Sequence, residues 1–497
     1  MIMRIKNKTE LTSHGNINGR KIVTELLDAG LDSIDPYYRV KQFITVKNGK
    51  IILNMQGFEM KDDPHSGPLE FDLKNYDRVF VIGAAKGVQR AALGFEEALG
   101  DILTAGHVIA KHGEKIICKK IGVTLAGHPV PDKYCIEGCK EIEKLTENLT
   151  DRDLVFTVFG SGCGSLFTYP AEGISIEDIA EFTHLMQIEK GVPTSELNQI
   201  RTHIDRFKGG RLLRQLMPAT VVNTVTADPS KTDTPIVRVP YFEMLKTNTF
   251  FPTVATASTY EDCIRIIKKH DAWERTPESI KNRLLNGTPD TENMSVDEYE
   301  SLGCRFFGLI FKDATVYPAV RNKAKELGIK CVMLSEYMQA EAREAGFSDA
   351  GIALTSVRSG EPFKAPIVLM SSGENVVTVG KENGVGGRNQ EYCIAAAIRI
   401  AGNKNIVFGA VDTDGTDGPG GLKIKGAPEC LAGALTDGYT IAEAEKAGID
   451  FSEALKTHGT SEPLWQINCG ISAESNVSAL DLRIIYIGDE ENERNGH

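Results

Sequence analysis

Three aspartates follow a short apolar run in the C-terminal part of the chain. The run covers residues 407–411, and Asp412, Asp414 and Asp417 come after it among several glycines. An apolar run that ends in glycines predicts a buried strand followed by a sharp turn. Ligands of open α/β sheets bind at the carboxyl ends of strands, and close carboxylates repel one another unless a cation lies between them. The spacing therefore predicts a Mg²⁺ site, because Mg²⁺ prefers oxygen ligands and often arrives with phosphates.

Two other interpretations of this acidic loop deserve comparison. Asp-Gly pairs are common in turns, so a plain acidic turn stays open as an alternative. An EF-hand also has aspartates at its first and third positions, but it closes with a glutamate where this chain has Lys423. Its required glycine is also displaced, to Gly418. The EF-hand interpretation is therefore excluded.

Basic residues mark the starts of two predicted helices. Residues 78–82 predict a strand, and Lys86 follows its turn at the beginning of a helix predicted over residues 86–99. A lysine is unfavourable beside the positive end of a helix dipole, which indicates that an anion binds between them. A solvated lysine is the alternative interpretation. Arg388 repeats the arrangement after the glycine-rich residues 384–387, and arginine suits bidentate contacts with phosphate or carboxylate.

A loop rich in glycine and serine covers residues 160–165 and follows an apolar strand predicted over residues 154–159. Such a continuous apolar run is expected for a parallel sheet that is covered on both faces. The backbone N–H groups of the loop and the Ser161 hydroxyl could bind an anion, and a tight turn without ligand is an equal alternative. A nucleophilic role for Cys163 is less favoured, because the sequence ties no histidine to it.

A basic cluster belongs to a helix predicted over residues 196–208. The apolar residues of this helix form its buried stripe, so Arg201 and Lys208 are expected on another face, with Asp205 between them. Two glycines end the predicted helix, and Arg211 follows them directly. A solvated, salt-bridged face explains such residues as well as an anion site does, so both interpretations remain open.

Composition restricts the class of protein. The chain has 497 residues, 41% of them hydrophobic and 25% charged, which predicts a globular protein of two or three domains. A net charge of −12 argues against a nucleic-acid partner. We expect neither a secretory signal nor a membrane-spanning segment, and the ten scattered cysteines predict reduced thiols in a cytoplasmic protein. Neither a dinucleotide fingerprint nor a Walker A loop is found.

Strand and helix patterns alternate in both halves of the chain, which predicts an α/β fold. Turn-forming residues at 286–295 predict a domain boundary there, with domains over residues 1–295 and 296–497.

Five motifs in order also resemble one family, the glycerate 2-kinases with a C-terminal MOFRL domain, often described as hydroxypyruvate reductases. The motifs cover residues 83–86, 127–132, 198–212, 386–391 and 412–418. The resemblance implies an N-terminal Rossmann-like, doubly wound domain, a MOFRL-type α/β domain, and an active site in the cleft between them. It also implies phosphorylation of the 2-hydroxyl of D-glycerate with ATP and Mg²⁺, and it matches Lys86 and Arg388 to the family's active-site lysine and arginine.

The candidate site residues follow from both lines of argument. Lys86, Arg388 and Asp414 are expected to act in catalysis, and Asp412, Asp414 and Asp417 to hold Mg²⁺ or accept the hydroxyl proton. Substrate or nucleotide binding is expected of Gly83, Ser161, Gly162, Gly164, Ser165, Asn198, Arg201, Lys208, Arg211, Gly387, Asn389, Glu391 and Asn476. The expected partners are a small acid and ATP, and a homodimer is left open.

Three glycine-rich loops depart from the family pattern. They contain Asp228-Pro229, the Gly162-Cys163-Gly164-Ser165-Leu166 segment, and residues 469–476. These departures leave open whether the acid is D-glycerate or a related sugar acid. They favour one alternative function, a diverged, non-catalytic protein that binds a small acid. A second alternative is the NAD(P)H-dependent hydroxypyruvate reductase of the family's other description, against which the missing dinucleotide fingerprint counts.

Overall fold

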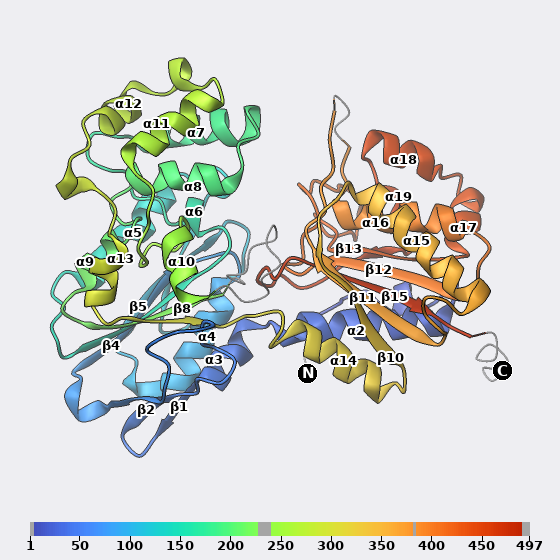
Figure 1. The fold of residues 1–497 in the computed structure, drawn as a ribbon, viewed down its shortest axis with the longest axis horizontal. Helices are drawn as coiled ribbons and strands as arrows, with labels where there is room; N and C mark the ends of the chain where they lie inside the picture. The colour runs from blue at the N-terminus through green and yellow to red at the C-terminus, as the bar shows by residue number, and fades with distance from the viewer. Residues whose placement is uncertain (1–3, 227–239, 381–383, 490–497) are drawn as a thin grey trace. The chain divides into compact units, whose positions relative to one another are not determined.

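The computed structural model describes residues 4–226, 240–380 and 384–489. The chain divides into two compact units (Figure 1). We call Asp35–Pro229 with Arg238–Phe311 the N-terminal unit, and Met1–Ile34 with Lys312–His497 the C-terminal unit. The departing loop at Asp228-Pro229 lies outside the described residues.

A six-stranded parallel sheet forms the centre of the N-terminal unit, in the order β6-β5-β4-β7-β8-β9. Its strands are β4 (Arg78–Ala84), β5 (Ala105–Lys111), β6 (Gly122–Ala126), β7 (Asp153–Phe159), β8 (Thr220–Val225) and β9 (Arg305–Gly308). The chain starts in the middle at β4, builds outward to β6, and then continues from β7 on the other side of β4. This is the strand order of a Rossmann-like doubly wound sheet, so the predicted fold class is confirmed. Every residue of β7 is buried, as its apolar sequence predicts.

Helices and a small antiparallel sheet surround these strands. The antiparallel sheet contains β1 (Ile44–Lys47), β2 (Lys50–Leu53) and β3 (Leu69–Asp72). The helices are α3 (Pro36–Phe43), α4 (Val88–Leu99), α5 (Lys133–Thr146), α6 (Cys163–Leu166), α7 (Ile176–Thr183), α8 (Thr194–His203), α9 (Arg211–Leu216), α10 (Tyr241–Thr247), α11 (Tyr260–Lys269), α12 (Glu278–Leu285) and α13 (Val296–Ser301). A π-helix, η3 (His184–Glu189), follows α7 directly. Helices α7, α8, α11 and α12 pack together around an apolar core of their own (Figure 1).

The C-terminal unit has a mixed six-stranded sheet in the order β10-β11-β15-β12-β13-β14. Its strands are β10 (Lys330–Met338), β11 (Ile367–Gly373), β12 (Ile406–Asp412), β13 (Gly433–Asp437), β14 (Gly470–Ile471) and β15 (Asp481–Ile487). Helices α2 (Ile17–Ser33) and α14 (Val316–Glu326) cover one face, and α15 (Ala342–Ser359) and α16 (Arg388–Ile400) cover the other (Figure 1). The remaining helices are α1 (Lys8–Leu11), α17 (Thr440–Lys446), α18 (Phe451–Thr457) and α19 (Ser461–Gln466). None of the helices in the described ranges is long and apolar enough to cross a membrane.

The division of the chain differs from the predicted boundary after residue 295. Strand β9 pairs in parallel with β8, so residues up to Phe311 belong to the N-terminal unit. Helix α2 packs on β12 and β15, which places the first residues of the chain in the C-terminal unit. Its Gly30 permits this packing, because a Cβ there would lie 2.4 Å from Cδ2 of Leu482. Contacts between segments far apart in sequence, rather than turn chemistry at 286–295, therefore set the boundaries.

A buried ion pair fixes α2 to its sheet and makes stability depend on pH. Arg20 Nε donates to Asp437 Oδ2 at 2.5 Å, and both side chains are 0% exposed. Burial acts to raise the pKa of Asp437, but the charge of Arg20 and their hydrogen bond outweigh it, so this pKa lies below its ordinary value. The pair therefore stabilises the fold fully above the unfolded-state pKa of about 3.9, and its contribution is lost as pH falls further.

We expect Arg20→Gln to lower the free energy of unfolding of the C-terminal unit by about 3–5 kcal/mol at pH 7, because it leaves the Asp437 carboxylate buried without its cation. The difference from wild type should narrow as the pH falls, because Asp437 without its cation becomes protonated at a higher pH in the variant than in the wild type, which relieves the buried charge. Urea unfolding followed through Trp465, in a Trp273→Phe background, would measure the free energy of unfolding of each variant. Lys21→Gln on the exposed side of α2 is the matched control, and an equal loss in that variant would contradict the assignment.

Candidate functional site

The first cluster of predicted residues lies at the carboxyl ends of β4 and β7. These neighbouring strands form the point where the strand order of the sheet reverses, which is where doubly wound sheets bind ligands. The Lys86 N–H donates to the Ser161 carbonyl at 2.8 Å, so the two loops are in contact. Gly162 has a φ of +87°, and a Cβ there would lie 3.0 Å from Cγ of Lys86 and 3.2 Å from Cδ2 of His128. A glycine is required at this position, and it brings Lys86 and His128 against the loop.

A cavity of about 220 Å³ opens beside this loop. It is lined by His128, Pro129, Gly162, Gly164, Ser165, Gln187, Thr194, Asn198, Arg201 and Phe250. Five of these residues were predicted as binding residues from the sequence, and His128-Pro129 belongs to one of the family motifs. Gln187, Thr194 and Phe250 were not predicted. Gly162, Gly164 and Ser165 of the predicted loop are therefore part of a cavity wall.

Arg201 is the charged group of this cavity. Its side chain is 6% exposed, and its guanidinium donates to Asn198 Oδ1 at 3.2 Å and to Gln187 Oε1 at 3.3 Å. Burial lowers the pKa of Arg201 to about 10, so the side chain remains cationic at neutral pH. Its hydrogen-bonding partners are neutral amides, and a buried cation in such surroundings favours an anionic ligand.

Three other predicted residues of this unit have structural contacts instead. Lys208 forms a buried ion pair with Asp205 at 2.7 Å, and Arg211 donates to the carbonyls of Thr202 and Asp205. Helix α8 ends at His203, five residues before the predicted end, so Lys208 does not share a helix face with Arg201. Gly83 is an interior residue of β4, where a Cβ would lie 1.9 Å from the Val158 carbonyl. Lys208, Arg211 and Gly83 are not among the residues that line the cavity.

The second cluster lies in the C-terminal unit, around the first residue of α16. Arg388 Nε donates to Asp481 at 2.9 Å, and Arg388 Nη2 donates to Asp412 Oδ2 at 2.8 Å. Burial acts to lower the pKa of Arg388, but the charges of Asp481 and Asp412 outweigh it and raise the pKa well above its ordinary value. Asp481, the first residue of β15, was not predicted, although β15 lies directly beside β12 in the sheet.

Asp417 caps the start of α16. Its carboxylate accepts the backbone N–H of Asn389 at 3.1 Å and that of Gln390 at 3.0 Å. A Cβ on Gly387 would lie 2.2 Å from the Asp417 carbonyl, so this glycine permits the acidic loop to approach the helix. Burial raises the pKa of Asp417 to about 6. Both carboxylate oxygens are thus engaged by the helix, which gives Asp417 a structural role beside its predicted role as a metal ligand.

Asp412 and Asp414 are the carboxylates that best fit a Mg²⁺ ion. The Asp414 N–H donates to Asp412 Oδ1 at 3.1 Å, so the acidic turn folds back on the end of β12. Burial and then the negative charge of Asp414 raise the pKa of Asp412 well above its ordinary value, and Arg388 offsets only part of this. A cation bound between these oxygens would relieve their repulsion, which fits the ligand chemistry of Mg²⁺.

The remaining predicted residues of this unit support the cluster. Asn389 Nδ2 donates to Asp481 at 2.8 Å and to Asp417 at 3.2 Å. The Asn476 N–H donates to the Asp414 carbonyl at 3.0 Å, which places the departing loop at residues 469–476 against the acidic turn. Glu391 pairs with His458 Nδ1 at 2.8 Å, away from the carboxylates that contact Arg388.

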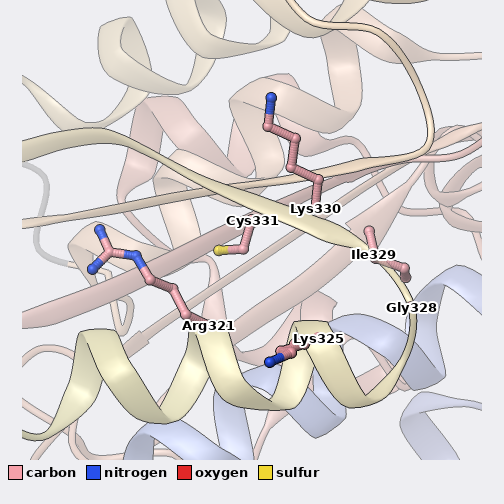
Figure 2. A pocket seen from close by; sticks show the side chains of 6 residues that line it. All are labelled: Arg321, Lys325, Gly328, Ile329, Lys330 and Cys331. Carbon is pink, nitrogen blue, oxygen red and sulfur yellow. The ribbon is translucent and has the colours of Figure 1, made fainter.

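A cavity of about 450 Å³ between α14 and β10 contains basic residues but no converging site (Figure 2). Lys330 points away from α14, the helix that bears Arg321 and Lys325. Burial raises the pKa of the Cys331 thiol in this cavity to about 11, which makes it a poor nucleophile.

His14, Glu443 and Cys469 bring three ligand atoms within 4.8 Å of one another, as a metal site would require. The Arg20 guanidinium, however, donates to Cys469 Sγ at 3.4 Å and lies 3.2 Å from His14 Nε2. An arginine therefore supplies the positive charge here.

Comparison with known proteins identifies the family of this chain. Residues 22–285 match the model of a domain of unknown function, DUF4147, and residues 367–476 match that of the MOFRL family. The chain is 30% identical to a glycerate 2-kinase of Pyrococcus horikoshii over 94% of its own length and 97% of that relative. The chain belongs to the glycerate 2-kinase family. A D-glycerate 2-kinase of Thermotoga maritima is 31% identical over 78% of this chain and 86% of that relative.

A solved structure supports the same conclusion. The crystal structure of a glycerate kinase from Thermotoga maritima superposes with a TM-score of 0.72 at 27% identity, and the match covers 94% of this chain and 99% of that one. The predicted family is confirmed, and the protein is a small-molecule kinase. The comparisons favour this function over the reductase and over the non-catalytic binding protein.

Proposed function

We propose that this protein phosphorylates a hydroxyl of a small hydroxy acid with ATP and Mg²⁺, and that the acid is D-glycerate, phosphorylated at its 2-hydroxyl. The observation that carries the proposal is the buried Arg201 in a cavity of about 220 Å³ at the switch point of the sheet, beside Lys86. The names of its relatives supply the substrate, since a family member is described as a D-glycerate 2-kinase.

The N-terminal unit would bind the acid. Arg201 offers a charge and a planar pair of donors for a carboxylate, and Asn198 fixes one side of the guanidinium. Lys86 lies against Gly162, a residue of the cavity wall, and its ammonium group would stabilise the negative charge that develops on the transferred phosphoryl group.

The C-terminal unit would supply the acidic residues that a phosphoryl transfer requires. Asp412 and Asp414 would hold Mg²⁺, which neutralises phosphate charge when bound. Arg388 would orient Asp412, since it holds Asp412 and Asp481 with separate nitrogens of one guanidinium. Asp414 would accept the proton of the attacking hydroxyl.

The test is ADP release from ATP and Mg²⁺ across a panel of short hydroxy acids. We expect turnover on D-glycerate, loss of turnover with EDTA, and a product whose phosphorus signal is that of 2-phosphoglycerate. Turnover confined to a longer acid would mean that the departing loops have rebuilt the substrate pocket. Oxidation of NADH or NADPH with hydroxypyruvate, without ADP release, would overturn the proposal in favour of the reductase.

A further inference from the structure

A π-helix carries Gln187 into the wall of the Arg201 cavity. Helix α7 continues directly into η3, and the Lys190 N–H closes a wide turn on the Leu185 carbonyl at 3.0 Å. Segments of this kind are rare in proteins and are often found at functional sites. The turn buries Leu185 and Met186 in the helical core and leaves Gln187 at the cavity.

Gln187 makes one of the two hydrogen bonds that fix the Arg201 guanidinium. Its Oε1 accepts from Nη2 at 3.3 Å, while Asn198 accepts from Nη1 on the other side. Because both acceptors are uncharged, they orient the arginine without neutralising it. The nearby carboxylate of Asp205 is itself paired with Lys208 at 2.7 Å.

Phe250 forms an apolar part of the same wall. It lies in the loop after α10, and Asn248 organises that loop: its Oδ1 accepts the N–H of Phe250 at 2.9 Å and that of Phe251 at 2.8 Å. The Asn248 amide also donates to the Ala255 carbonyl at 3.0 Å. These hydrogen bonds fix the backbone at Phe250 beside the cavity that this residue lines.

The size of the cavity favours a small occupant. Its volume of about 220 Å³ is below the roughly 300–1,000 Å³ that is typical of sites for drug-sized ligands. A complete nucleotide is of at least that size, whereas a three-carbon acid is much smaller. A phosphate group is an anion that Arg201 could also bind. The phosphates of the nucleotide are therefore the competing occupant of the cavity.

We propose that this cavity binds the carboxylate end of the acid substrate, that Gln187 positions Arg201 for that carboxylate, and that Phe250 limits the length of the acid. The inference rests on the proposed function and deepens it. It assigns the acid, rather than the nucleotide, to the N-terminal cavity, and it gives roles to two residues outside the family motifs.

The test compares Gln187→Ala with Gln187→Glu. Loss of one hydrogen bond to the charged Arg201 should raise the KM for D-glycerate roughly tenfold in Gln187→Ala, with kcat and the KM for ATP little changed. Gln187→Glu should raise the KM for D-glycerate by roughly another tenfold, because the new carboxylate would neutralise Arg201 and repel the substrate. If Gln187 has only a structural role, the KM for D-glycerate should rise more in Gln187→Ala than in Gln187→Glu, since glutamate keeps the shape of the side chain and strengthens its contact with Arg201.

Matched controls and a binding measurement complete the design. Ile188→Ala changes the next residue of the same π-helix, which is 54% exposed, and should leave every constant unchanged. Calorimetric titration of each variant with D-glycerate alone measures acid binding without turnover. If wild type binds D-glycerate without phosphorylating it, and Gln187→Glu weakens that binding, the proposed function fails and the acid site stands.

Two results would overturn the inference while the proposed function stands. A change in the KM for ATP, with the KM for D-glycerate unaffected, would assign the cavity to the nucleotide's phosphates. Wild-type constants in Gln187→Glu on an enzyme that turns over D-glycerate would make Gln187 structural.

Phe250 provides a separate readout of specificity. Phe250→Ala should raise the kcat/KM for a four-carbon hydroxy acid relative to D-glycerate by at least about tenfold, since accommodating one carbon is worth roughly 10–200-fold. Phe242→Ala is the matched control, because Phe242 is an exposed residue of the preceding helix. An unchanged preference in Phe250→Ala would remove Phe250 from the acid site.

Discussion

Arg388→Ala is expected to abolish kinase activity and to lower the free energy of unfolding of the C-terminal unit by about 3–5 kcal/mol. The arginine is half-buried between Asp412 and Asp481. Its removal leaves the buried Asp412 carboxylate without its cation, whereas Asp481 keeps the Arg483 guanidinium at 2.6 Å. The raised pKa of Arg388 reports the same attraction, since the charges of the two aspartates outweigh the effect of burial. The sequence predicts only a role in activity for Arg388, and its contacts with the buried carboxylates of Asp412 and Asp481 indicate that it also stabilises the fold.

ADP release and urea unfolding followed through Trp465 would measure the two effects separately. Arg399→Ala serves as the matched control, because Arg399 is an exposed arginine on the same helix and should change neither. A double-mutant cycle of Arg388→Ala with Asp481→Asn should show a coupling energy of about 1–3 kcal/mol. Wild-type turnover in Arg388→Ala would contradict the role we give this cluster, whatever the stability.

The sequence predicted the parts of the site that carry local signals. Apolar runs that end in glycines gave β7, β12 and the loops after them, and the glycines before Arg388 gave the start of α16. At each of these three positions, one short segment of sequence determines both the strand or helix and the polar residue at its end. The alternating pattern predicted an α/β fold, and the family resemblance implied the doubly wound sheet of the N-terminal domain; the order of its strands comes from the structure.

Other site residues depend on topology, which local patterns do not encode. Asp481 reaches Arg388 because β15 inserts between β11 and β12, and a strand buried on both faces looks the same in sequence whether it is parallel or antiparallel. Gln187 and Phe250 come from a π-turn and an irregular loop, neither of which has a periodic signal.

The basic cluster shows how an interpretation of one helix can fail. The apolar spacing continued to Phe207, but the backbone leaves the helix after His203. The carboxylate of Asp205 accepts the N–H groups of Tyr169, Phe207 and Lys208, which replaces the helical pattern by a side-chain-organised turn. Arg201 consequently faces the cavity, while Lys208 turns into the core.

Lys86→Ala is expected to reduce kcat by roughly 10²–10³, the usual cost of removing one group that stabilises developing negative charge. Lys86 lies in the turn after β4, against Gly162 and beside the cavity of Arg201. Its side chain is half-buried, so its loss should change the free energy of unfolding by less than about 1 kcal/mol. The comparison with Arg388 is informative. Lys86→Ala should lower the activity alone, whereas Arg388→Ala should lower both the activity and the free energy of unfolding.

Steady-state ADP release and urea unfolding followed through Trp273, in a Trp465→Phe background, would measure both quantities. Lys86→Arg keeps the charge but changes its geometry, so it should retain part of the activity that Lys86→Ala loses. Lys115→Ala, an exposed lysine in the loop between β5 and β6, is the control for a general change in charge. An equal loss of activity in Lys115→Ala would indicate a long-range electrostatic effect. Full activity in Lys86→Ala would mean that the anion expected at the start of α4 takes no part in the reaction.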